Sequence, residues 1–390
     1  MLIYTVFIIY YEFAMVDKYQ WDFRTYYYAA RAFDAGQNPY DIEALSKISL
    51  SPIGLKFVYA PLSLYAFKIF AYFEYKTAYY LFLSIKCVSL FLLILLWKKK
   101  FIEGGYDPIF YLLCLFGFNS AIALDMLAGN ISITEQLIIW AAFYFLLKNK
   151  TLIFGLLIVL AASLKITPIL LLGIIPLTEE KNRFRYFIVA GLVFAAGQII
   201  SFLATPDLYK GFLDNAAGLY ERGIINPSTY SLVRDPFDLV ARNYGIVSDS
   251  LIPTFIYLAV VAIVLWFSWR TFRAIISGDL EDRKLWIIYL YCVVFAIVMP
   301  RFKNYSYIML IVPGYYIIKR IDLGKTFPFL LIALILTIPN KWNVPGTGLI
   351  LRAFWDYYPL VLAYGIWFLY LNFVNSRVQE KKPIPENSAP

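Results

Sequence analysis

The stretch AYYLFLSIKCVSLFLLILLW, residues 78–97, decides the fold. Its twenty residues are apolar, aromatic or small apart from Lys86, and three lysines at 98–100 follow it directly. Because a helix needs about 20 apolar residues to cross a bilayer, this stretch predicts a transmembrane helix with a basic end. Similar apolar runs lie at 108–125, 133–147, 186–204, 251–269, 285–300 and 358–374.

The composition extends this prediction to the whole chain. Of 390 residues, 61% are hydrophobic and 16% are charged, against about 45–50% and about 25% in soluble domains. The mean hydropathy is +0.66. The 33 Tyr, 33 Phe and 9 Trp suit interfacial anchoring and aromatic walls around a lipid or sugar. We therefore expect an all-α, polytopic membrane protein rather than two or three soluble domains.

Several kinds of chemistry are excluded by the residues present. The chain has no histidine, and its three cysteines, Cys87, Cys114 and Cys292, lie inside apolar runs without metal or redox spacing. Acid–base chemistry therefore falls to Asp, Glu, Lys or Tyr. There is no phosphate-binding glycine loop or clustered-carboxylate metal motif, so we predict neither cofactor nor metal. The net charge of +9 resides in short breaks between apolar runs, which indicates a bilayer partner and no nucleic acid.

Shorter apolar segments raise the predicted number of helices to about twelve. The run from 152 to 177 is too long for one simple span and holds Lys165 and Pro168 at its middle, so we expect two short helices, 152–163 and 166–177. Segment 58–73 is short and contains a lysine, so we expect it to lie in the interface, although a crossing is the alternative. The remaining candidates are 1–16, 306–318 and 327–339.

The distribution of basic residues predicts the topology, because cytoplasmic loops are enriched in Lys and Arg. In this arrangement eighteen basic residues are cytoplasmic, namely Lys98, Lys99, Lys100, Lys148, Lys150, Lys181, Arg183, Arg185, Arg270, Arg273, Arg283, Lys284, Lys319, Arg320, Lys325, Arg377, Lys381 and Lys382. Four are in short outer loops, namely Arg301, Lys303, Lys341 and Arg352. We expect a cytoplasmic N-terminus, outer loops 17–57 and 205–250, a single transmembrane domain over 1–376, and a disordered cytoplasmic tail over 377–390.

The first outer loop carries the main catalytic candidate. It reads WDFRTYYYAARAFDAGQNPYD from 21 to 41, and residues 26–33 predict a short helix on the membrane. Asp22 follows an interfacial Trp, so its carboxylate is expected where a lipid-borne substrate and a water-side acceptor meet. The alternative is a helix cap or an ion pair with Arg24.

Two lysines lie within apolar sequence, where an ammonium is costly unless it faces protein, water or an anion. Lys165, between the two short helices, is a candidate for binding a phosphate at the membrane surface. The alternatives are snorkelling to the interface and pairing with a carboxylate. Lys86 lies deeper within its own span and is a weaker candidate of the same kind.

Three further segments are expected on the outer side. The turn 300–307 places Arg301 and Lys303 together, and their charges suit a phosphate leaving group, although a positively charged surface is the alternative. Segment 226–235 offers hydroxyl, amide and guanidinium groups from Asn226, Ser228, Tyr230 and Arg234. Segment 125–135 carries two carboxylates and Asn130 at a helix end; the carboxylates suit either sugar hydroxyls or helix capping.

The order of these segments resembles that of glycosyltransferase family 87, a group of polyprenol-phosphate-mannose-dependent alpha-mannosyltransferases with the GT-C membrane fold. The matching segments are DFRTYYYAARAFDAGQNPY at 22–40, FVYAPLSLYAF at 57–67, LAGNISITEQLI at 127–138, SLKITPILLL at 163–172, NPSTYSLVR at 226–234 and PRFKNYSYIMLIVP at 300–313. The resemblance implies a GT-C-like fold with juxtamembrane helices in the first outer loop.

The resemblance also implies an activity. An enzyme of the plasma (inner) membrane would move one sugar, mannose or another hexose or pentose, from a polyprenyl-phosphate donor to a glycolipid or glycan acceptor on the extracytoplasmic side, with inversion. The family's catalytic aspartate maps onto Asp22, as general base. The residues expected to bind the donor phosphate are Lys165, Arg234, Arg301 and Lys303. Those expected to bind substrate are Arg24, Tyr27, Asn130, Asn226, Ser228 and Tyr230.

Two features depart from the family pattern. Family members use a histidine near the active site, and this chain has none; Asn130 also stands where glutamine is common. The alternatives to a transferase are a transporter or flippase, or a polymerase, of lipid-linked sugars. The chain shows no convincing internal repeat of the kind common in transporters, and its charged candidates cluster at the predicted outer surface.

Overall fold

The computed structural model of the protein describes residues 18–102, 107–218, 221–245, 251–278, 280–321 and 354–380. Over these ranges the chain is helical and contains no strand, which confirms the all-α prediction. The chain divides into two compact units. The first unit contains residues 1–105 and 122–220, and the second contains residues 106–121 and 221–390.

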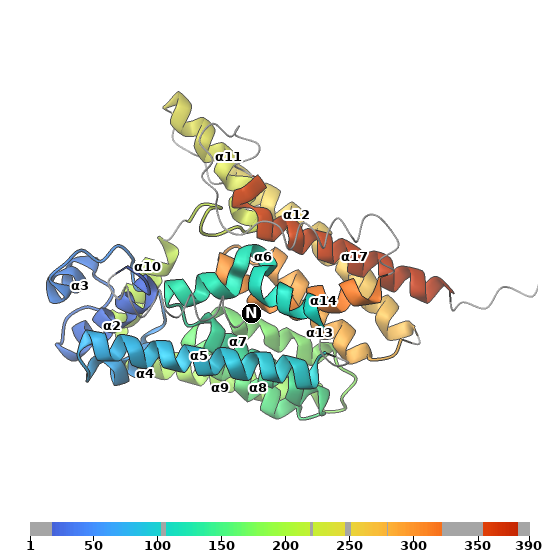
Figure 1. Ribbon diagram of the computed structural model, residues 1–390, viewed down its shortest axis with the longest axis horizontal. Helices are drawn as coiled ribbons and strands as arrows, with labels where there is room; N and C mark the ends of the chain where they lie inside the picture. The colour runs from blue at the N-terminus through green and yellow to red at the C-terminus, as the bar shows by residue number, and fades with distance from the viewer. Residues whose placement is uncertain are drawn as a thin grey trace, which may run out of the picture. The chain divides into compact units, whose positions relative to one another are not determined.

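The first unit is built on four helices that pack side by side in the order α5, α7, α8, α9 (Figure 1). Its core includes Trp97 and Trp140, whose rings meet edge to face at 5.8 Å. Gly155 of α8 lies so close to Ala190 of α9 that an added Cβ would be 2.9 Å from the alanine Cβ. The helices of this unit are α2 (Trp21–Asp34), α3 (Ile42–Ser49), α4 (Pro61–Ala71), α5 (Tyr75–Lys100), α7 (Ser132–Leu147), α8 (Thr151–Leu164), η1 (Thr167–Leu177), α9 (Arg183–Ala204) and α10 (Pro206–Ala217).

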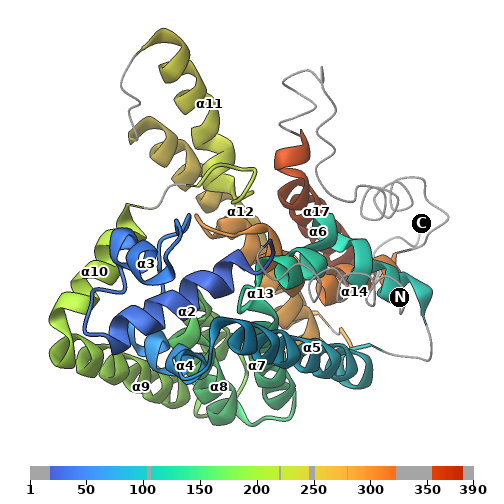
Figure 2. The same cartoon turned by 60° about the vertical axis from the view of Figure 1, so that its left-hand side comes forward.

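Short helices gather at one end of these longer ones. Figure 2 shows α2, α3, α4 and α10 together there, with α2 against α4. The contact is aromatic, because Tyr26 of α2 stacks on Phe67 of α4 at 4.5 Å. Phe23 of α2 also stacks on Phe82 of α5 at 4.4 Å. Burial of each such ring contributes about 1.5–3 kcal/mol. This packing fixes α2, whose first turn carries Asp22.

The second unit is built on α12, α13 and α17, which contact one another in every pairing. Trp286 of α13 lies at its core, with ring centroids 4.9 Å from Tyr316 and 5.4 Å from Tyr370. The elements of this unit are α11 (Thr229–Tyr244), α12 (Leu251–Ser277), α13 (Arg283–Val298), η2 (Asn304–Leu310), α14 (Ile311–Arg320), α17 (Tyr358–Glu380) and the first part of α6 (Pro108–Ala128).

Helix α6 is interrupted, whereas the sequence predicts one continuous helix over 108–125. Gly117 is extended, and Phe118, Asn119 and Ser120 have φ of 53°, 62° and 55°. Left-handed backbone costs about 1–2 kcal/mol per non-glycine residue. Tertiary packing opposes this cost, since Phe118 is fully buried and stacks on Tyr307 at 5.8 Å.

Among the described residues, five helices are long and apolar enough to cross a membrane. They are Tyr75–Lys100, Pro108–Ala128, Arg183–Ala204, Leu251–Ser277 and Tyr358–Arg377. Predicted spans 1–16 and 327–339 lie outside the described residues, and 306–318 is divided between η2 and α14. The total of about twelve, the orientation and the single-domain boundary remain predictions.

The structure shows which helices form in the segments 152–177 and 58–73 and at the start of the predicted tail. The run 152–177 forms α8 and η1, as predicted, with Lys165 extended between them at φ −148° and ψ 120°. Helix α4 has 11 residues, which span about 16 Å at 1.5 Å per residue, too short for a bilayer core of about 30 Å. Helix α17 ends at Glu380 and so includes the first residues of the predicted tail; residues 381–390 lie outside the described ranges.

Candidate functional site

Asp22 lies in the first turn of α2, a position where the helix dipole favours a carboxylate. The helix begins after Gln20, which is left-handed at φ 57° and whose backbone N–H donates to the carbonyl of Leu127 at 2.7 Å. The residue is 7% exposed. Asp22 is therefore neither a solvated surface carboxylate nor paired with Arg24, whose guanidinium donates to the hydroxyl of Ser51.

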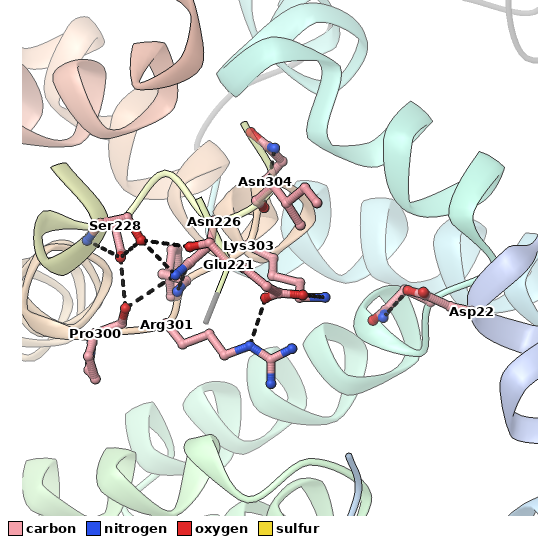
Figure 3. Close-up of polar contacts among 12 residues, drawn as sticks. Asp22, Glu221, Asn226, Ser228, Pro300, Arg301, Lys303 and Asn304 are labelled. Atoms are coloured by element: carbon pink, nitrogen blue, oxygen red, sulfur yellow. Dashed lines mark hydrogen bonds and ion pairs between the residues drawn. The ribbon is translucent and has the colours of Figure 1, made fainter. Parts of the chain in front are cut away.

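Asn130 holds the carboxylate of Asp22. Its Nδ2 donates to Oδ2 of Asp22 at 2.6 Å (Figure 3). Its Oδ1 accepts from the backbone N–H of Ser132 at 3.1 Å and from the Ser132 hydroxyl at 2.8 Å. Because a backbone N–H can only donate, these contacts assign oxygen to the Ser132 side and nitrogen to the Asp22 side. Of the predicted substrate-binding residues, Asn130 is thus in direct contact with the predicted base.

Two tyrosines complete the surroundings of Asn130. Nδ2 lies 3.0 Å from the hydroxyl of Tyr26 and 3.2 Å from that of Tyr59, and the two hydroxyls are 2.6 Å apart. Within the part of the chain that the structure describes, Oδ1 of Asp22 makes no hydrogen bond with protein. One carboxylate oxygen is thus held in place while the other remains able to accept a hydrogen bond from a substrate hydroxyl.

Lys86 reaches the same residue from α5. Its Nζ donates to the backbone carbonyl of Asn130 at 2.8 Å and lies 2.9 Å from Oδ2 of Asp125. Both charged side chains are 0% exposed. Between Asp125 and Asn130, Gly129 has φ +67° and lies against Gln20. The sequence favoured Lys86 weakly and left Asp125 open between capping and sugar binding; the structure pairs the two.

Lys165 is connected to this group through Ser132. Its Nζ donates to the Ser132 hydroxyl at 3.4 Å and lies 3.6 Å from Oε2 of Glu135. The Lys165 side chain is 22% exposed. Of the alternatives that the sequence left for Lys165, pairing with a carboxylate is the one the structure contains; its phosphate role stays a prediction.

In the second unit, Arg301 and Lys303 converge on Glu221. Nε of Arg301 lies 2.9 Å from Oε2, and Nζ of Lys303 lies 2.7 Å from Oε1 (Figure 3). Burial tends to raise the pKa of Glu221, but the charges of Lys303 and Arg301 outweigh it and hold that pKa below its usual value. Two cations with one carboxylate leave an excess of positive charge at this position.

Asn226 and Ser228 support the turn that carries these two cations. Oδ1 of Asn226 accepts from the backbone N–H of Phe302 at 2.7 Å, and the Ser228 hydroxyl donates to the carbonyl of Pro300 at 2.7 Å (Figure 3). Both residues are buried. Their predicted contact with substrate remains a prediction, while the hydrogen bonds present serve to position the turn at 300–304.

Arg234 and Tyr230 form a separate pair on α11. The Arg234 guanidinium donates to the Tyr230 hydroxyl at 3.2 Å and lies 3.5 Å from a carboxylate oxygen of Asp238, one helical turn on. The structure thus joins two of the predicted phosphate-binding residues, Arg301 and Lys303, through Glu221, and it pairs Arg234 with Asp238 on its own helix.

Tyr27, another predicted substrate-binding residue, donates from its hydroxyl to the carbonyl of Phe73 at 2.8 Å. Burial raises the pKa of Tyr27. Its hydroxyl is thus tied to the segment between α4 and α5.

Within the described residues there is no cluster of three or more Cys, Asp or Glu that would hold a metal ion.

Sequence reasoning missed four polar residues of these groups: Tyr26, Tyr59, Ser132 and Glu221. Ser132 lies two residues after Asn130 in the segment 127–138, so the sequence alone could have predicted that it lies close to Asn130. Glu221 precedes its partner Arg301 by 80 residues, and no spacing in one sequence predicts that contact.

The low pKa of Glu221 gives stability a pH dependence. A carboxylate with a folded-state pKa below its usual value stabilises the fold above the usual value of about 4.3, and this stabilisation is lost as pH falls through the folded-state pKa. We expect wild-type protein to melt above Glu221→Gln at neutral pH, with the difference in Tm shrinking below about pH 4. Thermal melts of both proteins in one detergent from neutral to acidic pH measure this. A constant difference would contradict it, and Glu43→Gln, at an exposed residue of α3, is the control.

Comparison with known proteins gives one match. The model of a family described as glycosyltransferase family 87 matches residues 57–300, more than half of the chain. No curated protein and no solved structure matches. The matched range contains Lys86, Asn130 and Glu221. Arg301 and Lys303 lie just after it, and Asp22 lies 35 residues before its start.

Proposed function

The chain belongs to glycosyltransferase family 87, and from this we propose that it transfers a single sugar from a polyprenyl-phosphate donor to a glycolipid or glycan acceptor. Family membership, with five helices able to cross a membrane among the described residues, makes the protein a membrane glycosyltransferase. The proposal adds the lipid donor, a plasma-membrane location, an extracytoplasmic reaction and inversion at the anomeric carbon. Mannose or another hexose or pentose is the proposed sugar.

The observation that carries the proposal is the buried carboxylate of Asp22, held at Oδ2 by Asn130. In the proposed reaction, Oδ1 of Asp22 removes the proton from an acceptor hydroxyl as that oxygen attacks C1 of the sugar. The new bond joins the acceptor oxygen to C1. The bond between C1 and the phosphate oxygen breaks, and its electron pair leaves with the polyprenyl phosphate.

The leaving phosphate gains negative charge in the transition state, which fixed cations stabilise. Arg301 and Lys303 are proposed for this role because Glu221 holds them 2.9 Å and 2.7 Å from its own oxygens and neutralises only one of their two charges. Lys165 and Arg234 remain candidates for the same role. Each has a carboxylate neighbour, Glu135 and Asp238 respectively.

The proposal requires neither a cofactor nor a metal, since a carboxylate base and cationic side chains suffice for this displacement. The other proposed substrate contacts are Arg24, Tyr27, Asn226, Ser228 and Tyr230. Family membership favours sugar transfer over the alternatives of a flippase or a polymerase of lipid-linked sugars.

The donor class can be tested with purified protein. Polyprenyl phosphate carrying a radiolabelled sugar is supplied with an extract of envelope glycolipids, and a nucleotide sugar is supplied in a parallel reaction. We expect label in the acceptor, and free polyprenyl phosphate in equal amount, from the lipid donor alone. Transfer from the nucleotide sugar would overturn the proposed donor, and loss of label without any transfer to an acceptor would indicate hydrolysis.

The phosphate-binding role predicts a specific kinetic change. Removing both cations in Arg301→Gln/Lys303→Gln should raise the donor KM about 10-fold or more, because each charge-assisted hydrogen bond contributes about 1.5–3 kcal/mol. The acceptor KM should be unchanged. The triple variant that also carries Glu221→Gln is measured as well, because the double change alone leaves the Glu221 carboxylate without its two cations. The control, Lys47→Gln/Lys56→Gln, removes two exposed charges and should leave the donor KM at its wild-type value, whereas an equal rise in both proteins would dismiss a specific role.

A further inference from the structure

We infer that Lys86 is a positioning residue for sugar transfer, which acts through Asn130 to place the carboxylate of Asp22. This inference rests on the proposed function, because it assigns Lys86 a role toward the proposed base. It concerns a lysine and an aspartate that the proposed reaction does not otherwise use.

Lys86 contacts both backbone and side-chain oxygens of the segment from Asp125 to Asn130. Its Nζ donates hydrogen bonds to the backbone carbonyls of Asp125 and, at 2.8 Å, of Asn130. It also forms an ion pair with Oδ2 of Asp125 at 2.9 Å. The Asp125 carbonyl lies in the last turn of α6, and the Asn130 carbonyl lies shortly before α7 begins at Ser132. Lys86 of α5 thus holds the segment that connects α6 to α7 at one point.

The two ends of Asn130 connect that point to Asp22. Its backbone carbonyl is bound by Lys86, and its side-chain nitrogen donates to Asp22 at 2.6 Å. A shift of the Asn130 backbone would therefore move the side chain that orients the base. Misplacement of a reacting group by about 1 Å is enough to cost about 100-fold in rate.

Stability alone is a poor reason for this ion pair. Two charges that are 0% exposed carry a large desolvation cost, and an apolar pair of similar volume is often equally stable. An apolar residue at 86, however, would leave the carbonyl of Asn130 without its bond. The charged pair thus supplies what packing cannot, a directional contact to Asn130.

The test removes both charges together and then repeats this change in an Asn130→Ala background, as a double-mutant cycle. Lys86→Met/Asp125→Leu removes both charges, so that neither is left buried and unpaired, and Lys86→Arg keeps the cation. Purified proteins are compared in kcat, donor KM and Tm. We expect the double variant to melt near wild type, with kcat about 10- to 100-fold lower, an unchanged donor KM, and partial recovery of kcat in Lys86→Arg.

The cycle separates positioning from a purely structural role. In an Asn130→Ala background the same double change should lower kcat by less than about twofold, because the side chain through which Lys86 acts is gone. Ser89→Ala is the matched control: its hydroxyl accepts from Thr134 at 3.2 Å and joins α5 to α7 without touching Asn130. That variant should keep kcat within about twofold of wild type.

Two outcomes would overturn the inference. One is wild-type kcat in Lys86→Met/Asp125→Leu. The other is a fold loss of kcat in the triple variant that equals the product of the losses in Lys86→Met/Asp125→Leu and in Asn130→Ala. If the double variant does not fold, Lys86→Arg still decides, since unchanged kcat with a displaced guanidinium would contradict a positional requirement. Failure of the proposed base is seen separately, as full activity of Asp22→Asn, and failure of the proposed transfer is seen as the absence of label in the acceptor when wild-type protein is supplied with the lipid donor.

Discussion

Asp22→Asn is expected to lower kcat about 1,000-fold with little change in Tm. An amide cannot take a proton from the acceptor hydroxyl at neutral pH, and a positioned general base typically contributes 10²- to 10⁴-fold, so the expected loss is about the middle of that range. The carbonyl oxygen of the new Asn can still accept from Nδ2 of Asn130, which approaches Asp22 at 2.6 Å in the wild type. Initial rates of label transfer from the lipid donor, with melting curves on the same preparations, measure both quantities.

Two variants calibrate this result. Asp22→Glu keeps the carboxylate but moves it along the side chain, and we expect intermediate activity. Asp34→Asn alters an aspartate at the other end of α2, which pairs with Lys68 at 2.6 Å and has no contact with Asn130; it should remain fully active. A fully active Asp22→Asn would remove Asp22 as the base and leave the family assignment intact.

Gly129→Ala is expected to lose both stability and activity. Gly129 has φ +67°, and an added Cβ would lie 2.6 Å from Cβ of Gln20 and 2.8 Å from its Cα. The left-handed conformation costs about 1–2 kcal/mol for alanine. The contact with Cα has no flexible side chain to relieve it, so backbone must move. Since Asn130 is the next residue, kcat should fall at least about 10-fold.

Gly36→Ala is the matched control for that substitution. Gly36 has φ +70°, follows α2 in the same unit, and has nothing within 4 Å of the position of an added Cβ. It should therefore show the conformational cost alone, with a smaller fall in Tm and wild-type kcat. Equal effects of the two substitutions on Tm and kcat would contradict a role for the contact with Gln20.

The helices of this protein were largely predictable, because long apolar runs carry their own signal. The division of 152–177 at Lys165 was readable from a charge and a proline, and it matches α8 and η1. The break in α6 was not. Its residues 117–120, Gly-Phe-Asn-Ser, include types common in turns, but they lie inside a long apolar run, and the buried stacking of Phe118 on Tyr307 that accompanies the break is a tertiary contact.

The candidate site was predictable where its members are close in sequence or lie in recognised segments. Asp22 and Asn130 were both selected, and they are in direct contact. Lys86 was favoured only weakly, because its partners Asp125 and Asn130 lie 39 and 44 residues away. Asn226 and Ser228 were chosen for their polar groups, yet these groups hydrogen-bond to the turn that carries Arg301.

Helix α9 has a consequence for how the sequence can vary. Of its 22 residues only Ala190 is buried, against Gly155, while many of the others, among them Ile188, Leu192 and Ile200, present large apolar side chains outward. Lipid tails accept any aliphatic or aromatic shape, whereas the contact between two small residues admits no added methyl group. Evolutionary exchange among Leu, Ile, Val and Phe should therefore be free at the exposed apolar positions of α9 and restricted at position 190.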